Sequence, residues 1–111
     1  MESINRQSLD AYKTVTVVGG IARLKPQYKR ILMENHFVPR IYNEDGSGFR
    51  EKMDQSDFII LFIGTVSHKA AHKVRKMAKL RAIPLATVTR SSITALRHLV
   101  FEMASKRYAL R

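Results

Sequence analysis

The chain has 111 residues, of which 45% are hydrophobic and 26% are charged, a composition typical of one folded domain rather than of a disordered chain. It contains no cysteine, which excludes disulfides, thiolate metal sites and thiol nucleophiles. The formal net charge is +11, and no stretch reads as a signal peptide or a membrane span. We therefore expect a soluble, cytoplasmic protein, not inserted in a membrane, with an anionic partner.

The positive charge is concentrated in the second half of the chain. Residues 1–57 carry nine Lys or Arg and eight Asp or Glu, whereas residues 58–111 carry eleven and one. Between Phe58 and Phe101 there is no carboxylate. Such asymmetry concerns partners rather than fold. It suggests nucleic acid first, and an anionic membrane surface or a small anion next.

The first half of the chain predicts two strands with a helix between them. After a polar N-terminal arm over residues 1–13, β-branched residues at 14–18 form a strand that ends at Gly19-Gly20. Pro26 suits the first turn of the following helix, where its missing N–H costs nothing. The second strand is predicted at residues 38–42, and its proline indicates an edge position or the start of the strand.

The second half repeats this alternation. Turn-forming residues at 44–48 and a short helix at 49–54 precede a third strand at 57–63, whose nearly unbroken apolar sequence is typical of a strand covered on both faces. Ser67 is a good N-cap for a helix over residues 67–82. A fourth strand follows at 84–88.

The last helix begins at Ser91 or Ser92, and the basic tail from Lys106 onward extends it. Alternating strands and helices with short connections predict an α/β fold with a parallel sheet and helices on both faces. We expect one three-layer domain over residues 14–111, with about four strands in the order 2-1-3-4, of the Rossmann or flavodoxin-like kind.

A candidate binding site lies where three loops are expected to meet, because open parallel sheets bind ligands beyond the carboxyl ends of their strands. Each loop places small or hydroxyl residues beside a cation or histidine and leads into a helix N-terminus, which favours an anion. The residues of this predicted anion site are Gly19, Gly20, Arg23, Thr65, Ser67, His68, Lys69, Arg90, Ser91 and Ser92. Cations at helix starts are unfavourable by about 0.3–1 kcal/mol each, which a bound anion would explain. A surface tuned only for solubility is the alternative explanation.

A second candidate site is the polar side of the helix at 67–82. The cationic and histidine side chains of this predicted nucleic-acid patch are His72, Lys73, Arg75, Lys76 and Lys79. A solvated face is the usual meaning of such a run, but this one has no acidic neighbours to pair with. Phosphate contacts of this kind give salt-dependent binding without sequence preference, and the signatures of the common sequence-reading folds are missing.

Histidine chemistry offers a further hypothesis. His68 and His72 are four residues apart and can face one way, but no third ligand completes a metal site. His68 is a candidate axial haem ligand or hydrogen-bond donor, with a solvated histidine as the alternative. Catalysis has little support, because carboxylates are scarce in this half and adjacent Ser67 and His68 do not make a triad.

Four segments of the chain resemble a bacterial family of domains of unknown function, number 2325. They are Thr16 to Gly20, the apolar strand led by Asp57, Thr65 to Ala71, and Pro84 to Arg90, within a resemblance that covers residues 14–103. The resemblance implies a small Rossmann-like domain that self-associates, for which we expect a homodimer, with no assigned reaction. Haem binding is associated with some relatives, and His68 in the Ser-His element is then the residue to test.

Three functions are consistent with these patterns. The first is a non-enzymatic module that binds nucleic acid or another phosphate-bearing partner. The second is a haem-binding or haem-sensing protein that uses His68. An enzyme acting on nucleotides or phosphorylated metabolites ranks lowest.

Overall fold

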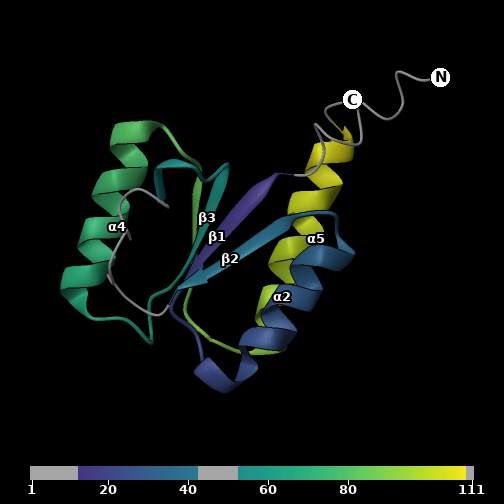
Figure 1. Ribbon diagram of the computed structural model, residues 1–111, viewed down its shortest axis with the longest axis horizontal. Coiled ribbons are helices and arrows are strands. Elements are labelled where there is room, and N and C mark those ends of the chain that lie inside the picture. The colour runs from purple at the N-terminus through teal and green to yellow at the C-terminus, as the bar shows by residue number, and fades with distance from the viewer. Residues whose placement is uncertain (1–12, 43–52, 110–111) are drawn as a thin grey trace.

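Four parallel strands form one sheet in the order β2-β1-β3-β4 in the computed structural model of the chain (Figure 1). The strands are β1 (Thr14–Val18), β2 (Val38–Tyr42), β3 (Phe58–Phe62) and β4 (Leu85–Val88). The structure describes residues 13–42 and 53–109, with side chains through residue 105. The predicted α/β class, the parallel sheet and the strand order are confirmed. The predicted N-terminal arm and the turn at 44–48 lie outside the described residues.

The helices cover both faces of this sheet. They are the 3-10 turn η1 (Ala22–Leu24), α2 (Lys25–Glu34), α4 (His68–Arg81) and α5 (Ile93–Ala109). Figure 1 shows α2 and α5 side by side on one face and α4 on the other, which confirms the predicted three layers. None of the helices within the described ranges has the length and apolar character that crossing a bilayer requires.

Element boundaries differ from the predictions by one or two residues. The third strand begins at Phe58, one residue later than predicted. The Asp57 N–H still donates to the Thr14 carbonyl, and the Asp57 carboxylate accepts from the Thr14 N–H at the start of β1 (2.8 Å each). β2 lies at the edge of the sheet, as its proline indicated. Ser92 caps the last helix, since its hydroxyl accepts from the Ala95 N–H (3.1 Å). Of the short helix predicted at 49–54, the described part, residues 53 and 54, is helical.

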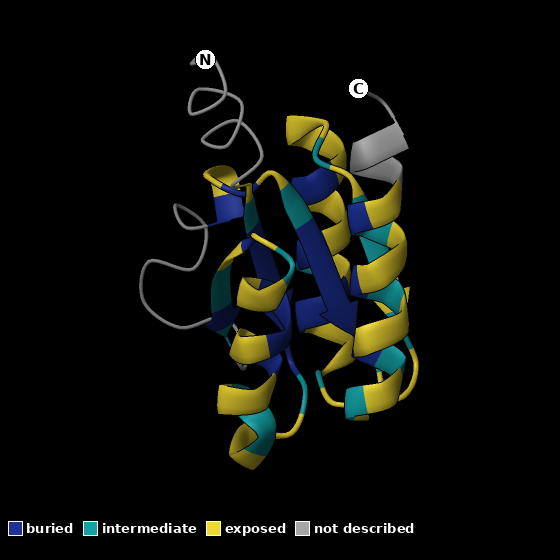
Figure 2. Ribbon diagram, turned by 90° about the vertical axis from the view of Figure 1, so that its right-hand side faces the viewer, coloured by how far each residue is buried: buried dark blue, intermediate teal, exposed yellow. Residues whose placement is uncertain are grey.

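Two apolar clusters hold the layers together, one on each face of the sheet. Alternate strand residues point to opposite faces, so β1 and β3 contribute to both clusters. The cluster against α2 and α5 contains Val15, Val17, Ile60, Phe62, Tyr28, Leu32, Leu96 and Val100. The cluster against α4 contains Val18, Met53, Ile59, Leu61, Ala71, Val74, Met77 and Ala78. Figure 2 shows the central strands buried between helices whose outer sides are exposed.

The end of α4 is closed by a non-glycine residue in the left-handed region. Ala82 has φ 55° and ψ 40°, and its N–H donates to the carbonyls of Ala78 and Lys79. The Ile83 N–H also donates to the Ala78 carbonyl (2.9 Å), so this is the Schellman arrangement, in which glycine is the usual residue. The turn is therefore imposed by packing at the cost of local strain.

Replacing Ala82 by glycine is expected to stabilise the fold. The left-handed conformation costs an alanine about 1–2 kcal/mol, which glycine avoids. Glycine loses more chain entropy on folding, which offsets about 0.5–1 kcal/mol of this gain. Urea unfolding of Ala82→Gly should show a gain of about 0.5–1 kcal/mol. Ala82→Val serves as the opposing control and should lose stability, because a β-branched side chain is poorly accommodated at positive φ. A lower midpoint for Ala82→Gly would contradict the assignment of strain.

Candidate functional site

The loops that follow β1, β3 and β4 are joined by hydrogen bonds. The Gly20 N–H donates to the Thr65 hydroxyl (2.6 Å), which links the first loop to the second. The Tyr28 hydroxyl accepts from the Ile21 N–H (3.0 Å) and donates to the Ser91 carbonyl (2.6 Å), which links the first loop to the third. The predicted convergence of these loops at the carboxyl edge of the sheet is confirmed.

The two glycines after β1 are required by this closure. Gly19 and Gly20 both have φ +93°, a backbone conformation that other residues rarely adopt. A Cβ on Gly20 would lie 2.7 Å from the ring of Tyr28, and one on Gly19 would lie 2.8 Å from Val66 Cγ1. Their role in the structure is a tight turn that lets the three loops approach one another.

Three hydroxyls of the predicted anion site take part in the fold itself. The Thr65 hydroxyl accepts from the first loop, as described above, and donates to the Phe62 carbonyl (3.2 Å). The Ser67 hydroxyl accepts from the Ala70 N–H (3.0 Å) as the N-cap of α4, and Ser92 does the same for α5. An anion at either helix start would have to compete with a side-chain cap that is already in place.

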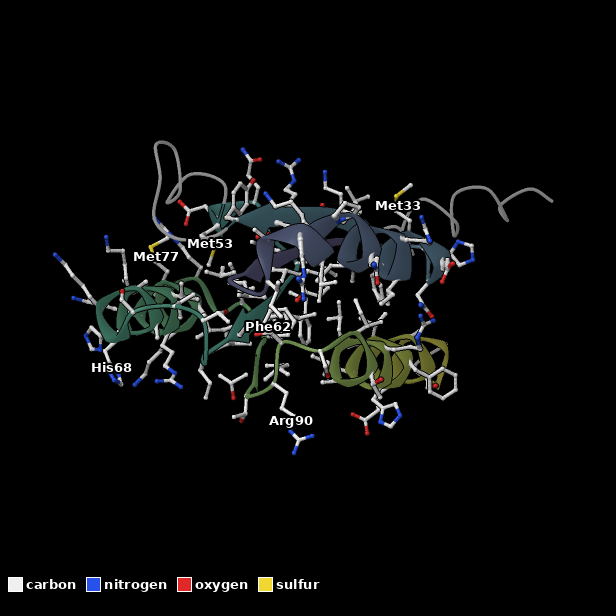
Figure 3. The ribbon with its side chains drawn as sticks, turned by 90° about the horizontal axis from the view of Figure 1, so that it is seen from below. Met33, Met53, Phe62, His68, Met77 and Arg90 are labelled. Carbon is white, nitrogen blue, oxygen red and sulfur yellow. The ribbon has the colours of Figure 1, made fainter. Side chains whose placement is uncertain are left out.

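The cations of the predicted anion site lie at the starts of three different helical segments. Arg23 lies in η1, His68 and Lys69 are the first two residues of α4, and Arg90 precedes α5; all four are exposed. Figure 3, seen from below, shows His68 at the left of the molecule on α4 and Arg90 apart from it near the middle of the lower border, each directed outward. The loops therefore converge, whereas these two side chains do not. Anion binding by any one of them stays a prediction.

The exposed side of α4 carries the densest group of cations in the described residues. We name this group, together with one histidine, the α4 basic face; its members are Lys69, His72, Lys73, Arg75, Lys76 and Lys79. All are exposed except Lys73, which is half-buried. The opposite side of the helix is the apolar stripe that the sequence predicted: Ala70, Ala71, Val74, Met77 and Ala78 are buried. The helix α4 thus packs against the core with one side and exposes its cations on the other.

A shallow groove runs along the α4 basic face. It has a volume of about 480 Å³ and is lined by Lys69, His72, Lys73, Lys76, Met77, Leu80 and Arg81. Leu80 is 72% exposed, so part of the groove is apolar. An ion pair closes the far end of the helix, where Arg81 Nε lies 3.0 Å from Asp54 Oδ1. The sequence predicted most of the cations of this groove but missed Leu80, because this exposed leucine lies outside the apolar stripe of the helix.

The described surroundings of His68 are those of an exposed helix start. Within residues 13–42 and 53–109, no three His, Asp or Glu side chains gather closely enough to hold a metal ion. His68 and His72 both lie on the exposed side of α4. The groove beside the helix is lined by His72 rather than by His68.

Comparison with known families places the chain. A family model described as "Uncharacterized protein conserved in bacteria (DUF2325)" matches residues 14–102. The chain belongs to this family. The match begins at β1 and takes in all the strands of the described residues, α2, α4 and most of α5. No curated protein matches the chain. The family description names no reaction or ligand, so the function of this DUF2325 domain has to be inferred from its own side chains.

The residue at this edge that sequence reasoning missed is Tyr28. Its position in the apolar stripe of α2 predicted burial, which is complete, but not the use of its hydroxyl. A buried tyrosine normally directs its hydroxyl to a partner. Here the ring packs on Phe62, with centroids 5.3 Å apart, and the hydroxyl is placed between two loops.

Removing this hydroxyl is expected to loosen the carboxyl edge of the DUF2325 domain. Tyr28→Phe keeps the ring contact with Phe62 but leaves the Ile21 N–H and the Ser91 carbonyl without their partner. Both hydrogen bonds are part-buried, and a hydrogen bond typically contributes about 0.5–1.5 kcal/mol. Urea unfolding followed by circular dichroism should therefore show a loss of about 1–3 kcal/mol for the two together. A loss within the roughly 0.5 kcal/mol typical of surface substitutions would show that the hydroxyl does not tie the loops together.

Proposed function

We propose that this domain is a non-enzymatic module that binds nucleic acid through the α4 basic face. The observation that carries the proposal is the concentration of exposed cations on one side of α4. The sequence has no carboxylate from Phe58 to Phe101, so these cations cannot pair with acidic residues of their own helix. Neutralising them with phosphates releases counterions from the nucleic acid, which drives binding at low salt.

The dimensions of the face suit a polymer better than a single small anion. Lys69 and Lys79 are ten residues apart, which corresponds to about 15 Å along a helix. A duplex carries about nine phosphate charges over that length. Cations spread in this way can each meet a different phosphate, whereas a small anion needs them to converge.

The groove adds a reason to favour this helix over the carboxyl edge of the sheet. At the edge, the hydroxyls that would hold a phosphate already cap helices or join loops. Along the groove, lysine ammonium groups with long flexible stems lie beside apolar Met77 and Leu80. Such a surface accommodates backbone phosphates without requiring a base sequence. A cytoplasmic location and a homodimeric state stay predictions of the sequence.

Salt and charge removal test the proposal together. Fluorescence anisotropy with labelled DNA and RNA oligonucleotides should show affinity falling by about two orders of magnitude or more between about 50 and 200 mM salt. Lys69→Gln combined with Lys76→Gln should weaken binding to all sequences alike. It should also flatten the dependence of log K on log salt by about one unit for each lysine removed.

The matched control removes the same charge from the opposite layer. Lys29→Gln combined with Arg30→Gln changes two exposed cations of α2 and leaves α4 intact. This variant should keep nearly all of the salt slope. Equal losses in both double variants would mean that net charge alone attracts the polymer, and no binding to DNA or RNA at low salt would end the proposal.

Haem binding through His68 is the alternative. Its imidazole is exposed at the first residue of α4 and is accessible to a ligand. Titration with hemin should then give a defined Soret band that His68→Ala abolishes, while His72→Ala, one turn along the same helix, retains it. An unchanged spectrum in His68→Ala would remove this histidine from the role.

A further inference from the structure

The strand at one end of the sheet, β4, has a neighbour on one side, β3. The Ile59 N–H donates to the Pro84 carbonyl (2.9 Å). Four residues further along β3, the Ile63 N–H donates to the Val88 carbonyl (3.1 Å). Backbone groups alternate in direction along a strand. Every second residue counted from Pro84 therefore bonds to β3, and the residues between them face away from the sheet.

The outward-facing residues of β4 are Leu85 and Thr87. No hydrogen bond from a described residue reaches the N–H or C=O groups that they direct away from β3. Thr87 is exposed and the other three residues of β4 are half-buried, so neither α4 nor α5 covers this edge. A row of unpaired backbone groups is a template for another strand.

The opposite edge of the sheet, formed by β2, lacks one of the outward backbone donors that an added strand would need. The Val38 N–H donates to the Lys13 carbonyl (2.8 Å), so the next residue of β2, Pro39, faces outward. Proline has no N–H, and this edge lacks a donor where another strand would need one. Arg40 adds a charge to the same strand. β4 has neither proline nor charge among Leu85–Val88, although such devices commonly protect edge strands.

We propose that β4 pairs antiparallel with β4 of a second copy of this chain, about a twofold axis at Ala86. In this register Leu85 lies opposite the partner's Thr87, and the two residues exchange both backbone hydrogen bonds. The axis repeats the same pair on its other side, so every outward N–H and C=O of the two residues finds a partner. The outward backbone groups of Leu85 and Thr87 lie symmetrically about Ala86, so a second copy of β4 can pair with all of them under twofold symmetry.

This pairing does not rest on nucleic-acid binding, and the two are expected to respond to salt concentration in opposite directions. The axis is perpendicular to the sheet, so the two α4 helices lie on the same face of the joined sheet. Two chains of formal charge +11 repel each other. Screening should therefore strengthen the dimer as salt rises, whereas it weakens nucleic-acid binding.

Cross-linking tests the register directly, because the chain has no cysteine of its own. Two copies of residue 86 would face each other as a non-hydrogen-bonded pair, with Cα atoms about 4.5 Å apart, within the range of a disulfide. Ala86→Cys should form a covalent dimer under mild oxidation, seen on a non-reducing gel. In Thr87→Cys the thiols are diagonal neighbours about 7–8 Å apart, beyond the usual span, and should cross-link far less.

This contrast excludes random collision, which would cross-link the more exposed position 87 better than position 86. Sedimentation velocity at high micromolar protein and high salt supplies the second readout. The original chain and Thr87→Val should sediment as dimers, because the backbone N–H is kept. Thr87→Pro removes that outward N–H without touching a bond to β3 and should sediment as a folded monomer. Should Thr87→Pro fail to fold, the cysteine pair decides.

Two results would overturn the proposal. One is a monomeric original chain under these conditions, and the other is equal or reversed cross-linking of the two cysteine variants. Loss of oligonucleotide binding in the variant that lacks Lys69 and Lys76, with unchanged cross-linking at position 86, would affirm both proposals as independent. Cross-linking without any nucleic-acid binding would retain the dimer and reject the proposed function.

Discussion

The Tyr28 hydroxyl is the interaction on which the carboxyl edge of the sheet depends. It lies in the core, where an unpaired hydroxyl would be costly, and it is satisfied by a donor from one loop and an acceptor from another. The Gly19-Gly20 turn makes room for the ring. Because these contacts connect the segments that lead into α2 and α5, the starts of both helices are fixed relative to β1. The edge is consequently held by its own polar groups.

Two surfaces of the molecule differ as a result: the carboxyl edge of the sheet is held together by its own polar groups, whereas the exposed side of α4 carries the cations. In many parallel α/β folds, the loops at the carboxyl edge are left free to bind a ligand. Here Thr65, Ser67 and Ser92 use their hydroxyls for loops and caps, and His68 and Arg90 are directed outward, apart from each other. The charge instead accumulates along α4, where the buried alanines let the helix lie close to the sheet. A helix with a thin apolar stripe leaves most of its circumference for lysine, arginine and histidine.

Sequence patterns predicted what depends on backbone topology and failed where side-chain direction decides. Strand order and the meeting of three loops follow from the alternation of elements, and both are present. The position of Pro39 on an edge strand followed from its missing donor. The separation of His68 and Arg90 could not be predicted, because it depends on where each loop leaves the sheet and how a long side chain extends. The bridging role of Tyr28 was equally hidden, since helical spacing reports burial and not the partner of a buried hydroxyl.

The unequal edges of the sheet bear on how far association can proceed. A sheet with two open edges can add strands at both and form filaments, whereas one blocked edge limits pairing to the other. Pro39 removes a donor from β2, so a pair formed through β4 presents only two blocked β2 edges in the described sheet. The high net charge opposes looser contacts between chains. An unprotected β4 is thus compatible with a closed twofold pair, because the features that would prevent fibre growth are present elsewhere in the same sheet.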